Sequence, residues 1–429
     1  MPFIHFDEAK EAAIGAAGAW IGAQAPKVQG MLIVDLFGKL RLVLRTGGDA
    51  DASGLEQDLA TQCGAWWTGE LLNIEELDEV TRQVYESAWQ TARLDDDEPR
   101  LRILDRHRSR TAWFSRSVEP PWHAPEEGPP IIVFYSFKGG LGRSTLLASF
   151  AIQRARMGER VCVLDFDLDS PGIGRLLSAD PEGMTARWGV VDFLLERSPT
   201  EAPLADYFHR CDRVAGAGEI VAFPSGYMDE GYADKLARVD LEEAPEAHES
   251  GLWKLLHRVR DELKPQWILL DARTGISEPA GQLLSGIAHL HVLLGTTHDQ
   301  SWQGLNRVLD RLGKERGLAD NPQAEVLLVQ AMVPAGETGK IAKEKFVARA
   351  EEEFDKRYYL VADEADPDRF WTLDDKDSQD APHASMPVDY DSRLASFGDI
   401  AEVADALCGG LYQPIVERIE SRFLTEPET

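Results

Sequence analysis

The feature that most constrains this chain is a glycine-rich stretch between an apolar run and a helical pattern. Residues 131–137 read IIVFYSF, which has the length and composition of a buried strand. Residues 144–158, STLLASFAIQRARMG, have the pattern of a helix, and KGGLGR lies between the two. The glycines allow backbone N–H groups to approach an anion without a Cβ clash, and the helix points its positive N-terminal end at the same place. This order predicts a phosphate-binding loop.

Short apolar runs alternate with helical patterns after this loop. The runs lie at 160–167, 267–271, 289–297 and 324–332. Continuous apolar strands separated by helices are typical of a parallel sheet that is covered on both faces. We therefore expect an α/β domain with a mostly parallel sheet over residues 131–429.

The N-terminal part has a different pattern. The segment 119–130, EPPWHAPEEGPP, contains five prolines and is neither helix nor central strand, so we interpret it as an interdomain linker. In the part of the chain that precedes this linker, the first expected element is a hairpin whose turn lies near Gly38 and Lys39. Helical patterns at 54–65 and 73–93 and a strand at 101–114 follow it. These elements predict a smaller N-terminal α+β domain, residues 1–118, whose function the sequence does not indicate.

Aspartates end two of the apolar runs. Asp165, Asp167 and Asp169 stand at the end of the run at 160–167, and Asp271 follows four apolar residues. Ligands of open α/β sheets bind at the carboxyl ends of the strands. At that edge Asp271 is expected to hold Mg²⁺ through a water, and Ser144 can offer its hydroxyl to the same ion.

The motif KGGLGRST resembles the deviant Walker A loop of the MinD/ParA-type (SIMIBI) P-loop ATPases, whose usual form is KGGxGK[ST]; it looks like the KGGVGR-motif variant. The resemblance covers about 130–428. It implies a P-loop NTPase domain that binds ATP and Mg²⁺ and forms a homodimer on ATP binding. It also implies that Lys138 reaches the partner's nucleotide and that Asp167 orients the attacking water. The chain departs from the family at Arg143, where the family has lysine.

The resemblance assigns the site residues. Lys138 and Asp167 are the expected catalytic residues, and the expected metal ligands are Ser144, Asp165 and Asp271. The expected nucleotide-binding residues come from the loop and from three later segments: Gly139, Gly140, Leu141, Gly142, Arg143, Ser144, Thr145, Arg273, Gln330, Pro387 and Asp389. Arg273 contacts either a phosphate or a switch carboxylate, or forms a structural salt bridge. Pro387 and Asp389 resemble the family's P-x-D adenine loop but also fit an ordinary turn.

Composition excludes some partners. The 45 Lys and Arg against 74 Asp and Glu give a formal net charge of −29, which argues against binding to bulk DNA or to an anionic membrane. Four cysteines without a CxxC pair, and acidic residues where a signal peptide would be basic, indicate a cytoplasmic protein. Five arginines between 100 and 110 either dock an acidic partner or form surface pairs.

We therefore expect an ATPase, slow or partner-activated, that acts as a nucleotide-dependent dimeric switch on a protein partner in bacterial signalling or defence. One alternative is a nucleotide-binding scaffold with little or no hydrolysis, because the guanidinium of Arg143 is planar and larger than an ammonium group. A second alternative is a P-loop protein kinase, although the tail has only Tyr412 where such kinases have several tyrosines.

Overall fold

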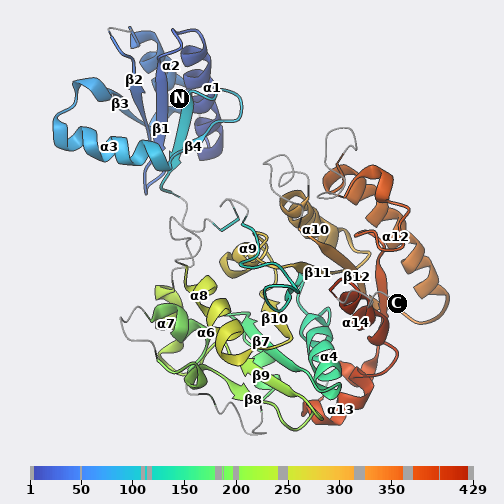
Figure 1. The fold of residues 1–429 in the computed structure, drawn as a ribbon. Coiled ribbons are helices and arrows are strands. Elements are labelled where there is room, and N and C mark those ends of the chain that lie inside the picture. Colours follow the sequence, from blue (N-terminus) through green and yellow to red (C-terminus); the bar gives the residue numbers. More distant parts are fainter. Residues whose placement is uncertain are drawn as a thin grey trace. The chain divides into compact units, whose positions relative to one another are not determined.

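The computed structural model describes residues 4–48, 51–107, 112–113, 118–178, 186, 188–196, 202–239, 250–313, 324–360, 371–395 and 397–423. The chain divides into two compact units, Met1–Arg110 and Thr111–Thr429. Each unit has its own sheet (Figure 1). None of the helices in these described ranges has the length and apolarity that a bilayer crossing requires.

The first unit is a five-stranded sheet with helices on both faces. Its strand order is β3-β2-β1-β5-β4. The strands are β1 Gln29–Val34, β2 Leu40–Arg45, β3 Trp67–Asn73, β4 Arg93–Leu94 and β5 Leu101–Asp105; the helices are α1 Phe6–Gly22, α2 Ser53–Cys63 and α3 Glu79–Thr91. Helix α1 packs closely through Ala9, Ala13 and Ala17, in one core with Leu32 and Leu42. Trp89 of α3 lies in the core on the other face. The expected hairpin is confirmed, because β1 and β2 pair antiparallel and Gly38 adopts a φ of 79° in the turn.

The second unit is built on an eight-stranded sheet of order β13-β12-β11-β6-β10-β7-β9-β8. Every pairing is parallel except that of β8 with β9, so the expected α/β architecture is confirmed. The strands are β6 Ile131–Ser136, β7 Arg160–Phe166, β8 His209–Arg210, β9 Glu219–Phe223, β10 Trp267–Ala272, β11 Leu290–Gly295, β12 Val326–Val333 and β13 Met386–Asp389. The helices are α4 Arg143–Arg156, α5 Ile173–Leu176, α6 Val190–Leu195, α7 Tyr232–Arg238, α8 Gly251–Arg258, α9 Glu278–Leu283, α10 Asp299–Leu312, α12 Gly336–Arg357, α13 Ile400–Leu407 and α14 Gln413–Glu420.

Both faces of this sheet are buried, as its apolar strands require. Successive strand residues point to opposite faces, so Val133 and Tyr135 lie in one core while Ile132 and Phe134 lie in the other. The first core includes apolar residues of α8, α9, α10 and α12, and the second includes those of α4, α13 and α14 (Figure 1). The C-terminal helix α14 therefore packs on the core through Ile415, Val416 and Ile419.

The proline-rich segment 119–130 packs within the second unit. Trp122 is 5% exposed, and its Nε1 donates a hydrogen bond to the carbonyl of Pro129 over 2.9 Å. The guanidinium of Arg260 lies 4.9 Å from the Trp122 ring centroid. The division between the units therefore falls before this segment rather than within it. The domain limits given above stay a prediction.

Strand β5 is shorter than the expected strand at 101–114. It ends at Asp105, and residues 108–111 and 114–117 lie outside the described residues. The arginine stretch is therefore only partly described: Arg100 forms an ion pair with Glu98 at 2.9 Å, and Arg102 donates to the carbonyl of Ala92. Arg108 and Arg110 lie outside the described residues.

Candidate phosphate-binding site

The glycine-rich loop joins β6 to α4 at the carboxyl edge of the large sheet. Gly140 and Gly142 adopt φ angles of 76° and 81°, which other residues rarely adopt. A Cβ at Gly139, Gly140 or Gly142 would meet no atom within 4 Å, so the loop borders open space. Gly142 precedes the first residue of α4, whose N-terminus has no side-chain cap. The N–H groups of this helix end remain available to an anion.

Arg143 joins two of the predicted aspartates. Its Nε donates to Oδ1 of Asp271 at 2.6 Å, and its Nη2 donates to Oδ2 of Asp167 at 3.1 Å. Ser144 Oγ donates to the second oxygen of Asp271 at 2.7 Å. The side chain of Arg143 is 8% exposed and that of Asp271 is 1% exposed. The structure thus brings Arg143, Ser144, Asp167 and Asp271 into one nearly buried cluster, called here the arginine–aspartate cluster.

The charge of Arg143 is stabilised by its partners. Burial alone lowers its pKa, but the charges and hydrogen bonds of Asp271 and Asp167 more than compensate and raise the pKa above its ordinary value. The arginine is therefore a permanent cation among the carboxylates of the cluster.

Asp165 lies beside Asp271 on the neighbouring strand and orders the loop after β7. The two residues are paired in register between β7 and β10. Asp165 Oδ1 accepts from the N–H of Asp167, and its Oδ2 accepts from the N–H groups of Gly172 and Gly174, all within 3.2 Å. Burial and the charge of Asp271 raise the pKa of Asp165 to about 7. A metal ion at Asp165 would have to replace these backbone bonds, and the role of this residue as a metal ligand stays a prediction.

The donor set for a metal is small. Within the described ranges, no group of three or more His, Cys, Asp and Glu side chains is arranged to hold an ion. Ser144 and Asp271 offer a hydroxyl and a carboxylate beside the open loop. Mg²⁺ in phosphate loops takes most of its other ligands from phosphates and water. The residues present therefore fit a magnesium–nucleotide complex.

Arg273, in the loop after β10, contacts the loop after β7. Its Nη1 lies 2.9 Å from Oδ2 of Asp169 and 3.5 Å from Oδ1 of Asp167. These contacts are ion pairs with carboxylates, and whether they belong to a switch or are structural salt bridges stays a prediction. Tyr135 of β6 donates through its hydroxyl to the carbonyl of Gly275 at 3.1 Å. No sequence pattern indicated this tyrosine, because an aromatic residue inside an apolar strand is ordinary core composition.

The residues predicted to surround the base lie together on the last two strands. Gln330 of β12 pairs with Pro387 of β13. The side chain of Gln330 is already used, since its Nε2 donates to the carbonyl of Ala342 at 3.1 Å. Asp389 forms an ion pair with Lys343 at 3.0 Å. The segment predicted as a loop is thus a short parallel strand, and the base-binding role of these residues stays a prediction.

Lys138 is the predicted catalytic residue that stands apart from the cluster. Ser136 Oγ donates to the Lys138 carbonyl at 2.8 Å, which fixes the start of the loop. The residue is half-buried, and among the described residues no ion pair engages its ammonium group. The reach of Lys138 to the nucleotide of a second copy stays a prediction.

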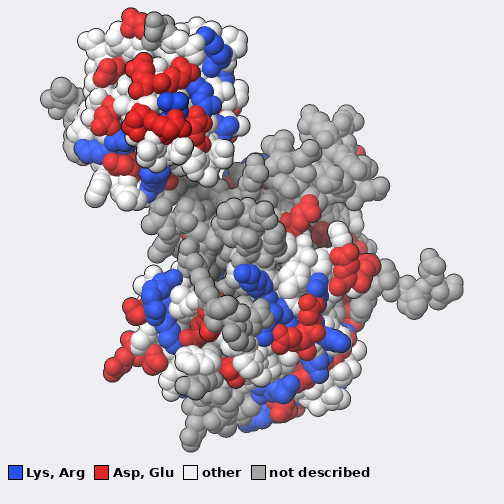
Figure 2. Space-filling view, turned by 60° about the vertical axis from the view of Figure 1, so that its left-hand side comes forward, with Lys and Arg blue, Asp and Glu red and all other residues white. Residues whose placement is uncertain are grey.

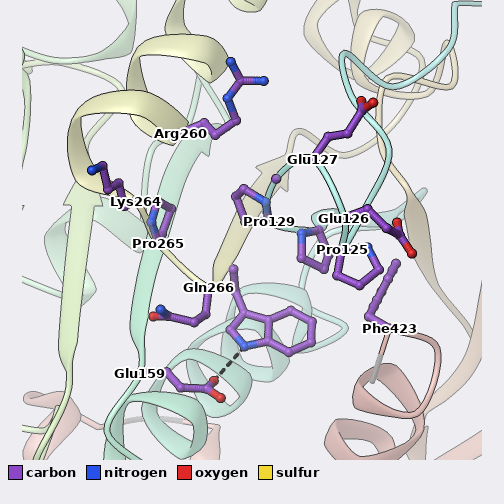
Figure 3. A pocket seen from close by; sticks show the side chains of 13 residues that line it. Pro125, Glu126, Glu127, Pro129, Glu159, Arg260, Lys264, Pro265, Gln266 and Phe423 are labelled. Carbon is purple, nitrogen blue, oxygen red and sulfur yellow. Dashed lines mark hydrogen bonds between the residues drawn. The ribbon is translucent and has the colours of Figure 1, made fainter. Parts of the chain in front are cut away.

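A separate cavity lies at the opposite, amino-terminal edge of the sheet (Figure 3). Its volume is about 470 Å³, and its lining includes Pro129 before β6 and Gln266 before β10. Trp267 is anchored there by a hydrogen bond from its Nε1 to Glu159 at 2.7 Å. This cavity is distinct from the phosphate loop, which lies at the other end of β6.

Comparison with known families identifies the loop region. Residues 129–194 match the ParA family model, described as NUBPL iron-transfer P-loop NTPase. The matched segment contains β6, the glycine-rich loop, α4 and β7. This part of the chain is similar to the ParA-type P-loop NTPases. The resemblance expected from KGGLGRST is confirmed over this segment.

Solved structures with a similar course of the chain include several partition and division proteins. The pNOB8 ParA bound to nonspecific DNA is 15% identical, with 68% of this chain and 99% of that chain covered and a TM-score of 0.43. A plasmid partition protein of Borrelia burgdorferi B31 bound to AMPPNP is 14% identical, with 69% and 100% covered and a TM-score of 0.45. MinD of Pyrococcus horikoshii OT3 with Mg-ADP is 17% identical, with 68% and 97% covered and a TM-score of 0.43. Similarity at this level carries no function over to this chain, and no curated protein matches it.

Proposed function

We propose that this protein binds ATP with Mg²⁺, hydrolyses the nucleotide and acts as a switch on a protein partner. The observation that carries the proposal is the open glycine-rich loop at the N-terminus of α4, beside the arginine–aspartate cluster. The family match over 129–194 supports nucleotide as the ligand class. Hydrolysis, dimerisation and the partner are the parts of the proposal that experiments have to establish.

The site residues have separate tasks in this proposal. Ser144 and Asp271 hold Mg²⁺, which supplies positive charge to the phosphate oxygens when bound. The backbone of Gly139, Gly140, Leu141, Gly142 and Thr145 lines the phosphates, and Arg143 neutralises their charge. Asp167 orients the attacking water, and Lys138 reaches the nucleotide of a second copy. Catalysis then rests on positioning and electrostatic stabilisation.

The partner is proposed to be a protein. Over the described residues of the face shown in Figure 2, Lys and Arg of the second unit are interspersed with Asp and Glu. Together with the net charge of −29, this speaks against bulk DNA or an anionic membrane as the ligand. We place the protein in the cytoplasm, with the first unit reading out the nucleotide state in a signalling or defence process.

A scaffold with little hydrolysis is the second candidate, and one observation favours it. Arg143 engages both Asp167 and Asp271, so the residue proposed to orient the water and the proposed metal ligand are neutralised by the same guanidinium. The kinase alternative gains no support, because Tyr412 is 5% exposed and packed in the core.

The test is to measure ATP affinity by calorimetry and phosphate release for the wild type, Lys138→Ala and Asp167→Asn. Lys340→Ala is the matched control, because Lys340 is a surface lysine whose side chain is 73% exposed. We expect both site variants to lose most of the phosphate release and the control to keep it. Tight ATP binding by the wild type with no turnover, even in the presence of proteins that co-purify with it, would favour the scaffold instead. Absence of ATP binding would refute both candidates.

A further inference from the structure

Arg273 occupies a position from which it can change partners. It reaches Asp169 at 2.9 Å and Asp167 at 3.5 Å from the loop that follows β10. Its side chain is 30% exposed and that of Asp169 is 45% exposed, so neither is fixed by a surrounding core. An ion pair this exposed contributes little stability and breaks at little cost.

The loop that carries Arg273 is tied to the strand that leads into the phosphate loop. Tyr135, which is fully buried in β6, donates to the carbonyl of Gly275. Arg273 also shares a carboxylate with the phosphate loop, because Asp167 accepts from Arg143 on Oδ2 and faces Arg273 with Oδ1. The carboxylate of Asp167 therefore links the guanidinium of Arg273 to that of Arg143, the first residue of α4.

The terminal phosphate of a nucleotide would compete with Asp169 for this guanidinium. Arginine binds phosphate and carboxylate in the same forked geometry, and a phosphate brings more negative charge than one carboxylate. Asp169 is the weaker competitor, since water reaches it and screens its charge. ADP has no phosphate at the terminal position and would leave the contact between Arg273 and Asp169 in place.

We propose that Arg273 discriminates ATP from ADP by exchanging Asp169 for the terminal phosphate, an inference that rests on the proposed nucleotide-binding function. The exchange also frees Oδ1 of Asp167, which Arg273 faces in this structure. When no terminal phosphate is bound, the ion pairs of Arg273 hold the segments 167–169 and 273–275 together. When the terminal phosphate is bound, these ion pairs break and the two segments separate. Ordering and release of such segments is a common way in which a terminal phosphate drives a switch.

The experiment measures the dissociation constants of ATP and ADP by calorimetry, with EDTA and with Mg²⁺, for four variants of the full chain. Arg273→Gln removes the charge, and we expect ATP affinity to fall about tenfold or more while ADP affinity stays unchanged. Asp169→Asn removes the competitor, and we expect ATP affinity to rise by roughly threefold. Arg273→Lys should restore part of the discrimination between ATP and ADP. Arg156→Gln, which breaks a surface ion pair with Asp405, is the control and should leave both constants unchanged.

The opposite signs at Arg273 and Asp169 separate sensing from a structural role. If Arg273→Gln weakens ATP and ADP equally, or if Asp169→Asn weakens ATP binding as Arg273→Gln does, the pair only holds the loops and the inference is overturned. If the wild type binds ATP and the Arg273→Gln variant still discriminates between ATP and ADP, the inference is overturned and the proposed nucleotide-binding function stands. Wild-type protein that binds neither nucleotide overturns the proposed function and the inference together.

Discussion

The pair between Arg143 and Asp271 makes a quantitative prediction about the nucleotide-free protein. Arg143→Met keeps much of the side chain's length but removes the charge. Asp271, whose side chain is 1% exposed, then remains a buried carboxylate, and within the described part of the chain only the hydroxyl of Ser144 still donates to it. Removing one partner of a buried ion pair costs about 3–5 kcal/mol.

The geometry supports a cost of this size. Arg143 Nε lies 2.6 Å from Asp271 Oδ1, and the Arg143 side chain is 8% exposed. Two unit charges whose centres are about 4 Å apart attract by roughly 4 kcal/mol at an effective dielectric constant of about 20. The second contact, from Nη2 to Asp167, is longer at 3.1 Å, and that carboxylate retains Arg273 nearby. Most of the loss should therefore arise at Asp271.

The assay is urea unfolding of the full chain without nucleotide, with Arg143→Met, Asp271→Asn and the double variant compared with wild type. The two units can unfold separately, so the transition of the second unit has to be fitted on its own. The double variant lacks both the guanidinium of Arg143 and the carboxylate of Asp271, so neither charge is left buried without the other. We therefore expect its loss of unfolding free energy to be at least about 2 kcal/mol smaller than the sum of the losses of the two single variants. A loss below about 1 kcal/mol for Arg143→Met, or additive losses, would refute the reasoning.

Three further variants test packing and protonation. Gly304→Ala places a Cβ 1.9 Å from Cγ of Phe137, the residue before Lys138, so overpacking should cost about 1–3 kcal/mol and weaken ATP binding in calorimetry. Gly15→Ala is its control in another helix: a Cβ there meets nothing within 4 Å, and unfolding should show a gain of about 0.5–1 kcal/mol. Burial lowers the pKa of His289 to about 4, and its Nε2 donates to the carbonyl of Trp122. The unfolded histidine binds a proton near pH 6.5, so this contribution is complete above pH 6.5 and is lost as the pH falls toward 4, by up to roughly 3 kcal/mol. His289→Gln should make the difference in unfolding free energy between pH 7 and pH 5 smaller. An unchanged difference would contradict a lowered pKa at His289.

The sheet of the second unit was predictable where its strands are continuous apolar runs. Strands β6, β7 and β11 lie within predicted runs, and β10 and β12 each end one residue beyond theirs, because parallel strands covered on both faces need apolar residues at nearly every position. The aspartates near the ends of β7 and β10 were predictable because they end apolar runs, and ligands of open α/β sheets bind at the carboxyl ends of the strands. Pairing of these neighbouring strands places Asp165 opposite Asp271.

Short strands at or next to the edges of this sheet were not predictable. Strand β9 has the sequence EIVAF and β13 only MPVD, which are too short to distinguish from turns without the neighbours that they pair with. Trp122 was missed as a core residue for a related reason. Its five neighbouring prolines indicate an exposed segment, whereas its burial depends on contacts with Arg260 and His257, far along the chain.

The partners of the site residues were also beyond the sequence. Spacing places Arg143 at the start of a helix and Asp271 at the end of a strand, but their contact spans 128 residues and depends on the packing of β10 beside β6. The sequence likewise left Arg273 undecided between a phosphate, a switch carboxylate and a structural salt bridge. Only the structure shows that it faces Asp169 and Asp167.

These contacts change what the arginine in place of lysine implies. Without nucleotide, Arg143 and Arg273 serve as counter-ions for Asp167, Asp169 and Asp271. In the proposed nucleotide complex, the same guanidinium groups pair with the phosphates, and the carboxylates that they leave need other partners. Binding is then an exchange of ion pairs rather than a simple gain of them, and its free energy is a difference between two large terms. A guanidinium suits such an exchange better than an ammonium group, because its separate donors can hold a carboxylate and a phosphate oxygen at once during the transfer.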